Sequence, residues 1–160
     1  MFVVVIMGVV SVSVIPAMDN LQGMREGAAR DDLVRLIEVA KGKAVASGRP
    51  FGIRVDLDRS SLTIVEINSQ GIIQIEYDPL TNSNRVIDIA ALYPGVAISS
   101  LTNGDGMTGP GTVWFDYESN PHTRDQSGGF VMLNSTQILI DLSSGDRVVV
   151  YPHSGMVEVQ

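Results

Sequence analysis

The chain has 160 residues, no cysteine and a formal net charge of −7 at pH 7. This length accommodates one domain of about 110 residues behind an apolar start, and it excludes two full domains. The lack of cysteine excludes disulfides, thiolate metal sites and cysteine nucleophiles. Residues 50–160 carry thirteen acidic and five basic side chains, and this balance disfavours contact with phosphate backbones and anionic lipid headgroups.

Residues 2–18 contain no charged side chain and predict the first part of a helix. At the helical rise they reach about 25 Å, slightly less than the ~30 Å hydrocarbon core of a bilayer. Pro16 lies near the end of the segment, where it would kink a helix that continues. We expect the segment to serve in membrane anchoring and assembly through Val3, Val4, Val5, Ile6, Gly8, Val9, Val10, Val12, Val14, Ile15 and Pro16.

The alternative for residues 2–18 is a secretory signal peptide that is removed. Such a signal begins with a basic stretch and ends at a cleavage site with small residues. Here no lysine or arginine precedes Arg25, and "IPAM" at 15–18 makes a poor cleavage site. The sequence therefore favours a segment that stays attached to the protein.

Residues 19–48 predict an amphipathic helix that continues the apolar segment, giving one helix over 2–47. On the solvated face, Glu26–Arg30 and Asp31–Arg35 are spaced four apart with the acid first, which favours ion pairs. Gly48 and Pro50 are predicted to stop the helix, since glycine suits the left-handed C′ position and proline prevents resumption. The residues predicted to pack against the rest of the protein recur at three- and four-residue spacing: Ala29, Leu33, Leu36, Ile37, Ala40 and Ala44.

After Pro50 the pattern predicts strands. "FGIRVDL" at 51–57 alternates apolar and polar residues, and "SLTIVEI" at 61–67 and "GIIQIEY" at 71–77 follow at hairpin spacing. Residues 79–111 are less regular, and their glycine content predicts a long flexible loop at 102–111. Five short runs between 112 and 159 predict an antiparallel meander.

These elements predict an α+β fold, in which a long N-terminal α-helix packs on one face of an antiparallel β-sheet head. We expect two parts: an N-terminal helix over residues 1–48, and a β-rich head over residues 49–160. Within the first part, residues 2–18 form the membrane segment and residues 19–48 the amphipathic segment.

Three stretches of the sequence resemble the GspH/FimT-type pseudopilins, which are type IV pilin-like minor subunits. Gly8 and Pro16 stand eight residues apart within the apolar run, as the inner glycine and proline do in that family. The end of the helix, "KAVASGRPFGIRVD" at 43–56, is similar to the family's Gly-Arg-Pro junction. A weaker match is "VWFDYESNP…SGGFVML…DRVVVYPHSGMVEV" between residues 113 and 159. Residues 65–111 carry no part of the resemblance.

On this alignment Met1 falls inside the apolar helix. The family's basic leader, its cleavage site and the Phe-Thr-Leu-Ile-Glu start would all precede it. We therefore expect the sequence to be truncated at its N-terminus. With Arg25 and Arg30 as the nearest positive flank, the positive-inside rule would favour the wrong orientation for a pilin, which is a departure from the family.

The resemblance implies a structural subunit and not an enzyme: a minor pseudopilin of a type II secretion system, at or near the pseudopilus tip. It implies a single-pass inner-membrane protein with a periplasmic head, and prepilin processing and methylation of the full-length precursor by a prepilin peptidase. The implied partners are other major and minor pseudopilins, the inner-membrane assembly platform and exported cargo. Two alternatives stay open. One is a type IV pilus minor pilin in pilus assembly or DNA uptake, and the other is a membrane-anchored periplasmic binding or enzymatic domain.

Candidate sites for chemistry in the sequence are weak, and we expect no cofactor and no metal. His122 and His153 lie beside prolines, 31 positions apart, which favours exposed turns over a metal site. No G-x-S-x-G motif occurs, so a serine hydrolase site is disfavoured. "NGDG" at 103–106 lacks the alternating ligands and the distal glutamate of a calcium loop.

One predicted strand has a further interpretation, as an aromatic platform that binds nucleic acid. Trp114 alternates with Phe115 and Tyr117, so we expect one face of the strand in the core and the other shared with a neighbour. The same strand carries Asp116 and Glu118, and DNA-uptake pilins have arginines where this chain has Gly155-Met156-Val157-Glu158. We therefore expect no nucleic-acid partner.

Overall fold

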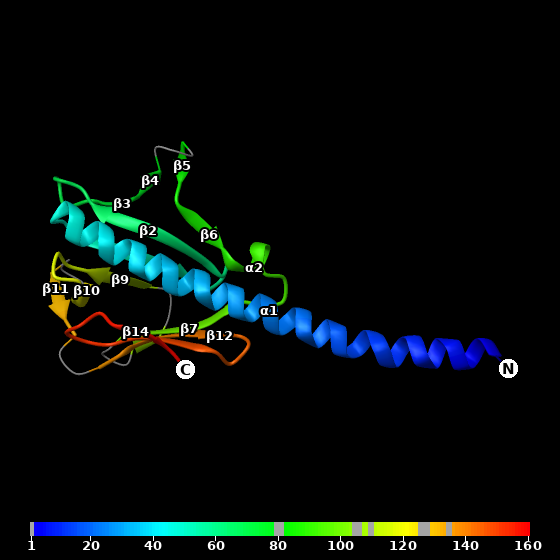
Figure 1. The fold of residues 1–160 in the computed structure, drawn as a ribbon. Coiled ribbons are helices and arrows are strands. Elements are labelled where there is room, and N and C mark those ends of the chain that lie inside the picture. The colour runs from blue at the N-terminus through cyan, green and yellow to red at the C-terminus, as the bar shows by residue number, and fades with distance from the viewer. Residues whose placement is uncertain (1, 79–81, 104–106, 109–110, 125–128, 134–135) are drawn as a thin grey trace.

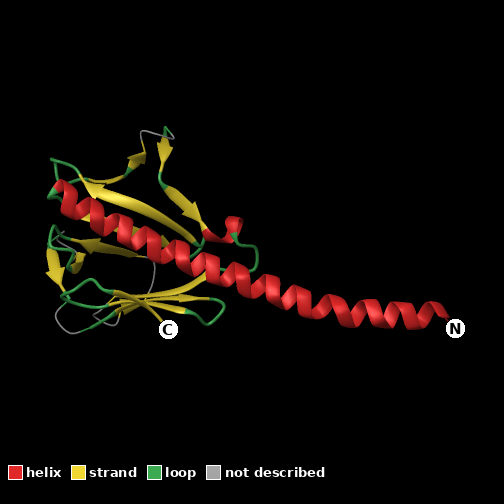
Figure 2. Ribbon diagram, in the orientation of Figure 1, coloured by secondary structure: helices red, strands yellow, loops and turns green. Residues whose placement is uncertain are grey.

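The computed structural model describes the chain except residues 1, 79–81, 104–106, 109–110, 125–128 and 134–135, and describes only the backbone of 2–20, 103, 107 and 108. One helix, α1 (Phe2–Ser47), precedes a head made of strands (Figure 1). Its N-terminal part extends beyond the head, and its C-terminal part lies along it (Figure 2). Within the described part of the chain, no helix has both the length and the hydropathy of a membrane span.

The larger of the two main sheets, here the large sheet, runs in the order β11-β10-β9-β1-β2-β3, with β6 also paired to β2. All pairings between its described strands are antiparallel. Its strands are β1 (Phe51–Asp56), β2 (Ser61–Ile67), β3 (Ile73–Ile75), β6 (Val86–Asp88), β9 (Gly111–Phe115), β10 (Pro121–Arg124) and β11 (Phe130–Met132).

The second sheet has the order β14-β13-β12-β7-β8. Its strands are β7 (Ile98–Asn103), β8 (Met107–Thr108), β12 (Ile138–Leu142), β13 (Arg147–Val150) and β14 (Val157–Val159). A separate hairpin of β4 (Tyr77–Asp78) and β5 (Ser83–Asn84) projects from the head, and a short helix, α2 (Ile89–Leu92), follows β6 (Figure 1).

One hydrophobic core joins the helix to both sheets. α1 contacts β1, β2 and β9 of the large sheet and β13 and β14 of the second sheet. It therefore lies across strands of both sheets (Figure 2). From the large sheet the core takes Phe51, Ile53, Val55, Leu62, Ile64, Val113 and Phe115, and from the second sheet Ile98, Leu101, Ile138, Ile140, Leu142, Val148 and Val150.

The predicted α+β arrangement of a long helix on an antiparallel head is confirmed, but the predicted meander is wrong. The runs after residue 112 divide between two sheets: β9, β10 and β11 continue the large sheet, whereas β12, β13 and β14 belong to the second. β9 pairs with β10 on one side, and on the other with β1, which lies about sixty residues earlier in the chain. A meander prediction uses only neighbours in sequence, so it has no means of finding this pairing.

The region from 79 to 111 is also more ordered than predicted. It contributes β6, α2 and β7, and β7 is a central strand of the second sheet. Within the predicted loop at 102–111, residues 102–103 and 107–108 pair as strands, whereas 104–106 and 109–110 lie outside the described residues. The "NGDG" reading depends on Asp105 and therefore also lies outside them.

The two sheets meet where the turn after β13 contacts the turn after β9. Gly155 has a φ of +58°, and a Cβ at this position would overlap the backbone carbonyl oxygen of Ser119. It would also lie 3.4 Å from Cε of Lys41 in α1. Gly155 therefore allows a close approach between the second sheet, the large sheet and the helix.

Replacing Gly155 with alanine should destabilise the head strongly, because backbone has to move to make room. Gly145 is the matched control: its φ is +98°, but no atom lies within 4 Å of a Cβ there. We expect Gly145→Ala to cost about 1 kcal/mol of unfolding free energy for its backbone conformation. Gly155→Ala should cost at least about 2 kcal/mol more. Chemical denaturation of the two variants measures both values, and equal losses would contradict the close approach.

Candidate assembly surfaces

The predicted packing stripe of α1 faces the core. All six of its residues are at most 3% exposed: Ala29, Leu33, Leu36, Ile37, Ala40 and Ala44. Other apolar residues of the same helix face outward, with Leu21 at 54%, Met24 at 72% and Val45 at 53% exposed. The described part of α1 therefore has an inner face that its own head covers and apolar positions that it does not cover.

The helix ends at the residues predicted to stop it. Gly48 adopts a φ of +65°, and its N–H donates to the Ala44 carbonyl at 3.0 Å. Ser47 Oγ donates to the Lys43 carbonyl at 2.7 Å. Pro50 follows, and β1 begins at Phe51. This turn sends the chain directly from the helix into the central strand of the large sheet.

The ion pairs on α1 differ from those expected from spacing. Arg35 pairs with Asp32 at 2.7 Å, and Arg30 pairs with its neighbour Asp31 at 3.3 Å, so neither predicted four-residue pair forms. Glu26 instead accepts a hydrogen bond from Gln22 at 2.9 Å. Exposed pairs of this kind contribute little free energy, so side-chain rotamers decide among them.

Polar contacts from the head hold the helix at two points along its length. Beyond α2, the Tyr93 hydroxyl donates to the Asp32 carboxylate, and this hydrogen bond, together with burial, raises the pKa of Tyr93. Near the other end, Lys43 forms an ion pair with Glu76, whose side chain is only 8% exposed. Glu76 lies between β3 and β4, so this ion pair ties the base of the projecting hairpin to α1.

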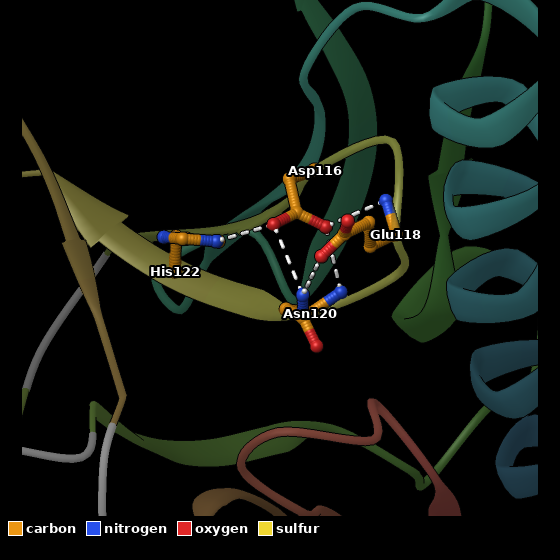
Figure 3. A network of polar contacts seen from close by, with 4 residues as sticks. All are labelled: Asp116, Glu118, Asn120 and His122. Atoms are coloured by element: carbon orange, nitrogen blue, oxygen red, sulfur yellow. Dashed lines mark hydrogen bonds and ion pairs between the residues drawn. The ribbon is translucent and has the colours of Figure 1, made fainter.

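A second polar cluster occupies the turn between β9 and β10 (Figure 3). Asp116 Oδ1 accepts from the backbone N–H groups of Glu118 and Asn120, both at 2.8 Å. Asp116 Oδ2 lies 3.2 Å from Asn120 Nδ2 and 2.9 Å from His122 Nε2. Ser119 completes the turn with a φ of +68°. Asp116 therefore closes the turn and orients the ring of His122.

Asp116 is stabilised as a carboxylate. Burial by itself would raise its pKa, but the hydrogen bonds from His122, Asn120 and Glu118 outweigh it, so the pKa of Asp116 lies below its ordinary value. His122 is only 9% exposed, and within the described residues its Nδ1 has no hydrogen-bond partner. The prediction of an exposed turn is therefore wrong for His122, which lies in β10, whereas His153 does lie in an exposed turn.

The large sheet has an aromatic cluster on the face away from α1. Trp114 lies against Gly52, where a Cβ would come within 2.9 Å of the indole ring. Phe130 packs edge-on to Trp114 with ring centroids 5.8 Å apart, and Arg124 lies over both rings, at 5.9 and 5.5 Å. Together these contacts leave Trp114 only 1% exposed.

The prediction that this strand shares one face with a neighbour is therefore wrong for Trp114, which its own chain covers. Phe115 points to the core and is fully buried. Tyr117 lies beyond the end of β9, in the turn, and is 61% exposed. In the described part of the chain, no group of three or more histidine, aspartate or glutamate side chains is arranged to hold a metal ion.

Two solved structures of the minor pseudopilin EpsH from the type II secretion system of Vibrio cholerae are similar to this chain. One has a TM-score of 0.52 at 16% identity, over 84% of this chain and 94% of its own. The other has a TM-score of 0.53 at 18% identity, over 82% and 89% of the two chains. The chain has the fold of a minor pseudopilin. No protein-family model and no curated protein sequence matches it.

Burial identifies which of the described surfaces are internal. The stripe on α1, the helix stop and the aromatic cluster all belong to the folded head itself. The residues predicted for the membrane segment, Val3 to Pro16, lie in the projecting part of α1, and their side chains are outside the description. Their role in anchoring and assembly stays a prediction.

Leu33 tests the packing of α1 on the head. Leu33→Ala should cost about 2–5 kcal/mol of unfolding free energy, because it leaves a cavity among core residues. Leu21→Ala, the matched control on the same helix, removes an exposed side chain and should change stability by less than about 0.5 kcal/mol. Thermal or urea unfolding measures both, and similar effects at the two positions would contradict the burial of the stripe.

The lowered pKa of Asp116 predicts that the folded protein loses stability in acid. Because folding lowers its pKa, the stabilising contribution of Asp116 is complete above its unfolded pKa of about 3.9 and is lost as pH falls through the lower folded value. Asp116→Asn should therefore be less stable than wild type at pH 7, and the difference should narrow below about pH 4. Urea unfolding at several pH values measures this difference.

Glu118→Gln is the control for that experiment, because it removes a charge from the same turn without changing the Asp116 carboxylate. Its effect should stay within about 0.5 kcal/mol at every pH. If the difference in unfolding free energy between wild type and Asp116→Asn is unchanged at pH 3, the Asp116 carboxylate does not stabilise the fold as stated.

Proposed function

We propose that this chain is a minor pseudopilin of a type II secretion system, a structural subunit at or near the tip of the pseudopilus. The observation that carries the proposal is the likeness in fold to EpsH, which covers 84% of this chain and 94% of the EpsH chain in one of the two structures. The family motifs at residues 43–56 and 113–159 support it independently, because they are features of sequence and not of fold.

In this role, α1 supplies the association free energy and the head selects partners. The outward positions Leu21 and Met24 are apolar and exposed, and they lie just beyond residues 2–18, which carry no charged side chain. Side chains of this kind are stabilised when neighbouring helices cover them. Other pseudopilins would provide those helices in the assembled pseudopilus.

The proposal includes a location and a life cycle. Before assembly, residues 2–18 anchor the subunit in the inner membrane with its head in the periplasm. A prepilin peptidase processes the precursor, and the assembly platform then moves the subunit into the pseudopilus. The acidic head contacts other minor subunits or exported cargo, and no catalytic step is assigned to it.

A secretion assay tests the proposal. Deleting the gene in its natural host should leave a folded exoprotein in the periplasm, and wild-type complementation should restore its activity in the medium. Met24→Glu should fail to complement although its head stays folded, since it puts a charge where neighbouring helices pack. Glu118→Gln, a single substitution at an exposed position of the head, is the control and should complement fully.

Two outcomes would contradict the proposal. Normal secretion in the deletion strain together with lost pili or lost DNA uptake would favour a type IV pilus minor pilin. Normal secretion and normal pili, with a small ligand bound to the head, would favour a membrane-anchored periplasmic binding domain.

A further inference from the structure

Arg54 lies in the centre of the large sheet, on the face away from α1. Its strand, β1, runs between β9 and β2. The neighbouring residues Ile53 and Val55 are 1% exposed and belong to the core under the helix. Because successive side chains of a strand point to opposite faces, Arg54 projects to the other face, where it is exposed.

The Arg54 guanidinium has no hydrogen bond and no ion pair among the described residues. Other arginines of the head are engaged within the fold. Arg124 lies over the ring of Trp114 on the same face of the sheet. Arg147 pairs with Asp141 in the second sheet. A single exposed arginine is ordinary at a protein surface, so the groups that surround Arg54 decide what it can bind.

Two threonines flank Arg54 across the sheet. The register places Thr63 of β2 and Thr112 of β9 directly opposite Arg54, so all three side chains project to one face. Neither threonine hydroxyl has a hydrogen-bond partner among the described residues. A guanidinium between two hydroxyls forms a row of donors, and such a row suits the two oxygens of a carboxylate.

Exposed apolar side chains adjoin this row of donors. Val86 of β6 lies opposite Thr63 and is 48% exposed. Ile75 of β3 lies opposite Val65, which is two residues from Thr63 on β2, so Ile75 projects to the same face. Ile75 is 38% exposed, and it forms an apolar patch with Val86 at the end of the row.

Two carboxylates lie on the other side of the row. Asp56 and Asp88 are both opposite Ser61, and they follow Arg54 and Val86 two residues along their own strands. This spacing puts each carboxylate on the same face, about 7 Å beyond the row. Neither aspartate forms an ion pair among the described residues. Along the strands, the face therefore presents apolar side chains, then donors without partners, then negative charge.

We propose that this part of the sheet, here the docking face, binds another protein subunit through one aspartate or glutamate of that subunit. The partner's carboxylate lies against Arg54 and the two threonine hydroxyls. An apolar side chain of the partner covers Val86 and Ile75, and a lysine or arginine lies over Asp56 and Asp88.

The pattern of charge selects this kind of occupant. DNA or an anionic lipid surface would place further negative groups over Asp56 and Asp88, which repel them. A free carboxylate would meet one exposed guanidinium in water, and exposed contacts of this kind are weak. A protein surface adds an apolar contact and a matching cation, which give affinity and selectivity together.

The identity of the partner as a subunit of a different kind rests on the proposed function. A second copy of this chain is a poor match, because residues 50–160 carry thirteen acidic and five basic side chains and two such heads repel each other. A contact defined at three points along the docking face selects one partner, which suits a fixed neighbour better than cargo that has to be released.

Photo-crosslinking in the natural host tests the contact on the full chain. A benzophenone amino acid replaces Val86, whose exposure gives room for the larger side chain. Ultraviolet light should attach the head to one other subunit of the assembly, and the attached peptide should contain an aspartate or glutamate. The adduct by itself shows only proximity, so the decisive readout is its yield in variants of Arg54.

Arg54→Glu should lower the yield of the adduct about tenfold or more, the factor expected for the loss of one charge-assisted hydrogen bond. Arg54→Gln, which removes the charge and keeps a polar side chain, should lower it as well. Arg49→Glu makes the same change of charge at an exposed position just before β1 and should leave the yield unchanged. Thermal unfolding of all three variants should match wild type, because neither arginine side chain has a hydrogen bond or ion pair among the described residues.

Exchange of the charges identifies the pair directly. The attached peptide locates the partner's acidic residue, and changing that residue to arginine should restore the adduct in the Arg54→Glu background. The same partner variant should lower the yield with wild-type Arg54, because two cations then face each other.

Three results would overturn the inference: a yield that Arg54→Glu leaves unchanged, an adduct only with a second copy or with an exported protein, or a loss that no exchange of charge restores. The secretion assay is independent of them. Lost secretion on deletion together with any of these results would retain the proposed function and remove the docking face. An adduct that depends on Arg54, in a host whose secretion does not need the gene, would do the reverse.

Discussion

The burial of one face of α1 between two sheets is the constraint on which the rest of the structure depends. The apolar side chains of β1, β2 and β9 and those of β12 and β13 form one core with the buried face of the helix, which contacts both sheets. Small residues at Ala29, Ala40 and Ala44 let the helix backbone come close to the strands, and Leu33, Leu36 and Ile37 occupy the space that remains. Removing the helix would expose both sheets at once, so helix and head form a single cooperative unit.

Polar contacts fix the orientation of the helix on the sheets. Tyr93 and Asp32 fix one point along the helix, and the ion pair of Lys43 with the buried Glu76 fixes another near its end. Glu76 also places the projecting hairpin, because its backbone N–H donates to the Ile64 carbonyl at 2.9 Å in the neighbouring strand. The turn at 116–120 belongs to the same frame, since Ser119 lies against Gly155 of the second sheet. The orientation of the helix on the head is therefore set by contacts within the chain itself.

This rigidity bears on the proposed function. A helix held in one orientation presents its outward residues Leu21 and Met24 in a fixed relation to the head. In the proposed role, subunits that pack on these residues would meet the head in a defined position, with little further loss of entropy.

Features with a local cause could be predicted from the sequence. The three- and four-residue spacing determined the buried stripe, Gly48 and Pro50 determined the helix end, and alternation determined β1 and β2, because each depends on residues close together in the chain. Only the tertiary structure decided the pairing of β9 with β1, the division into two sheets, and the burial of Trp114 and His122. Those features depend on contacts between residues far apart in sequence. A signal for the Asp116–His122 pair was present in "DYESNPH", where an aspartate begins a tight turn and a histidine follows six residues later. Its meaning became clear only once β9 and β10 were paired, because that pairing brings the two side chains to one face of the hairpin.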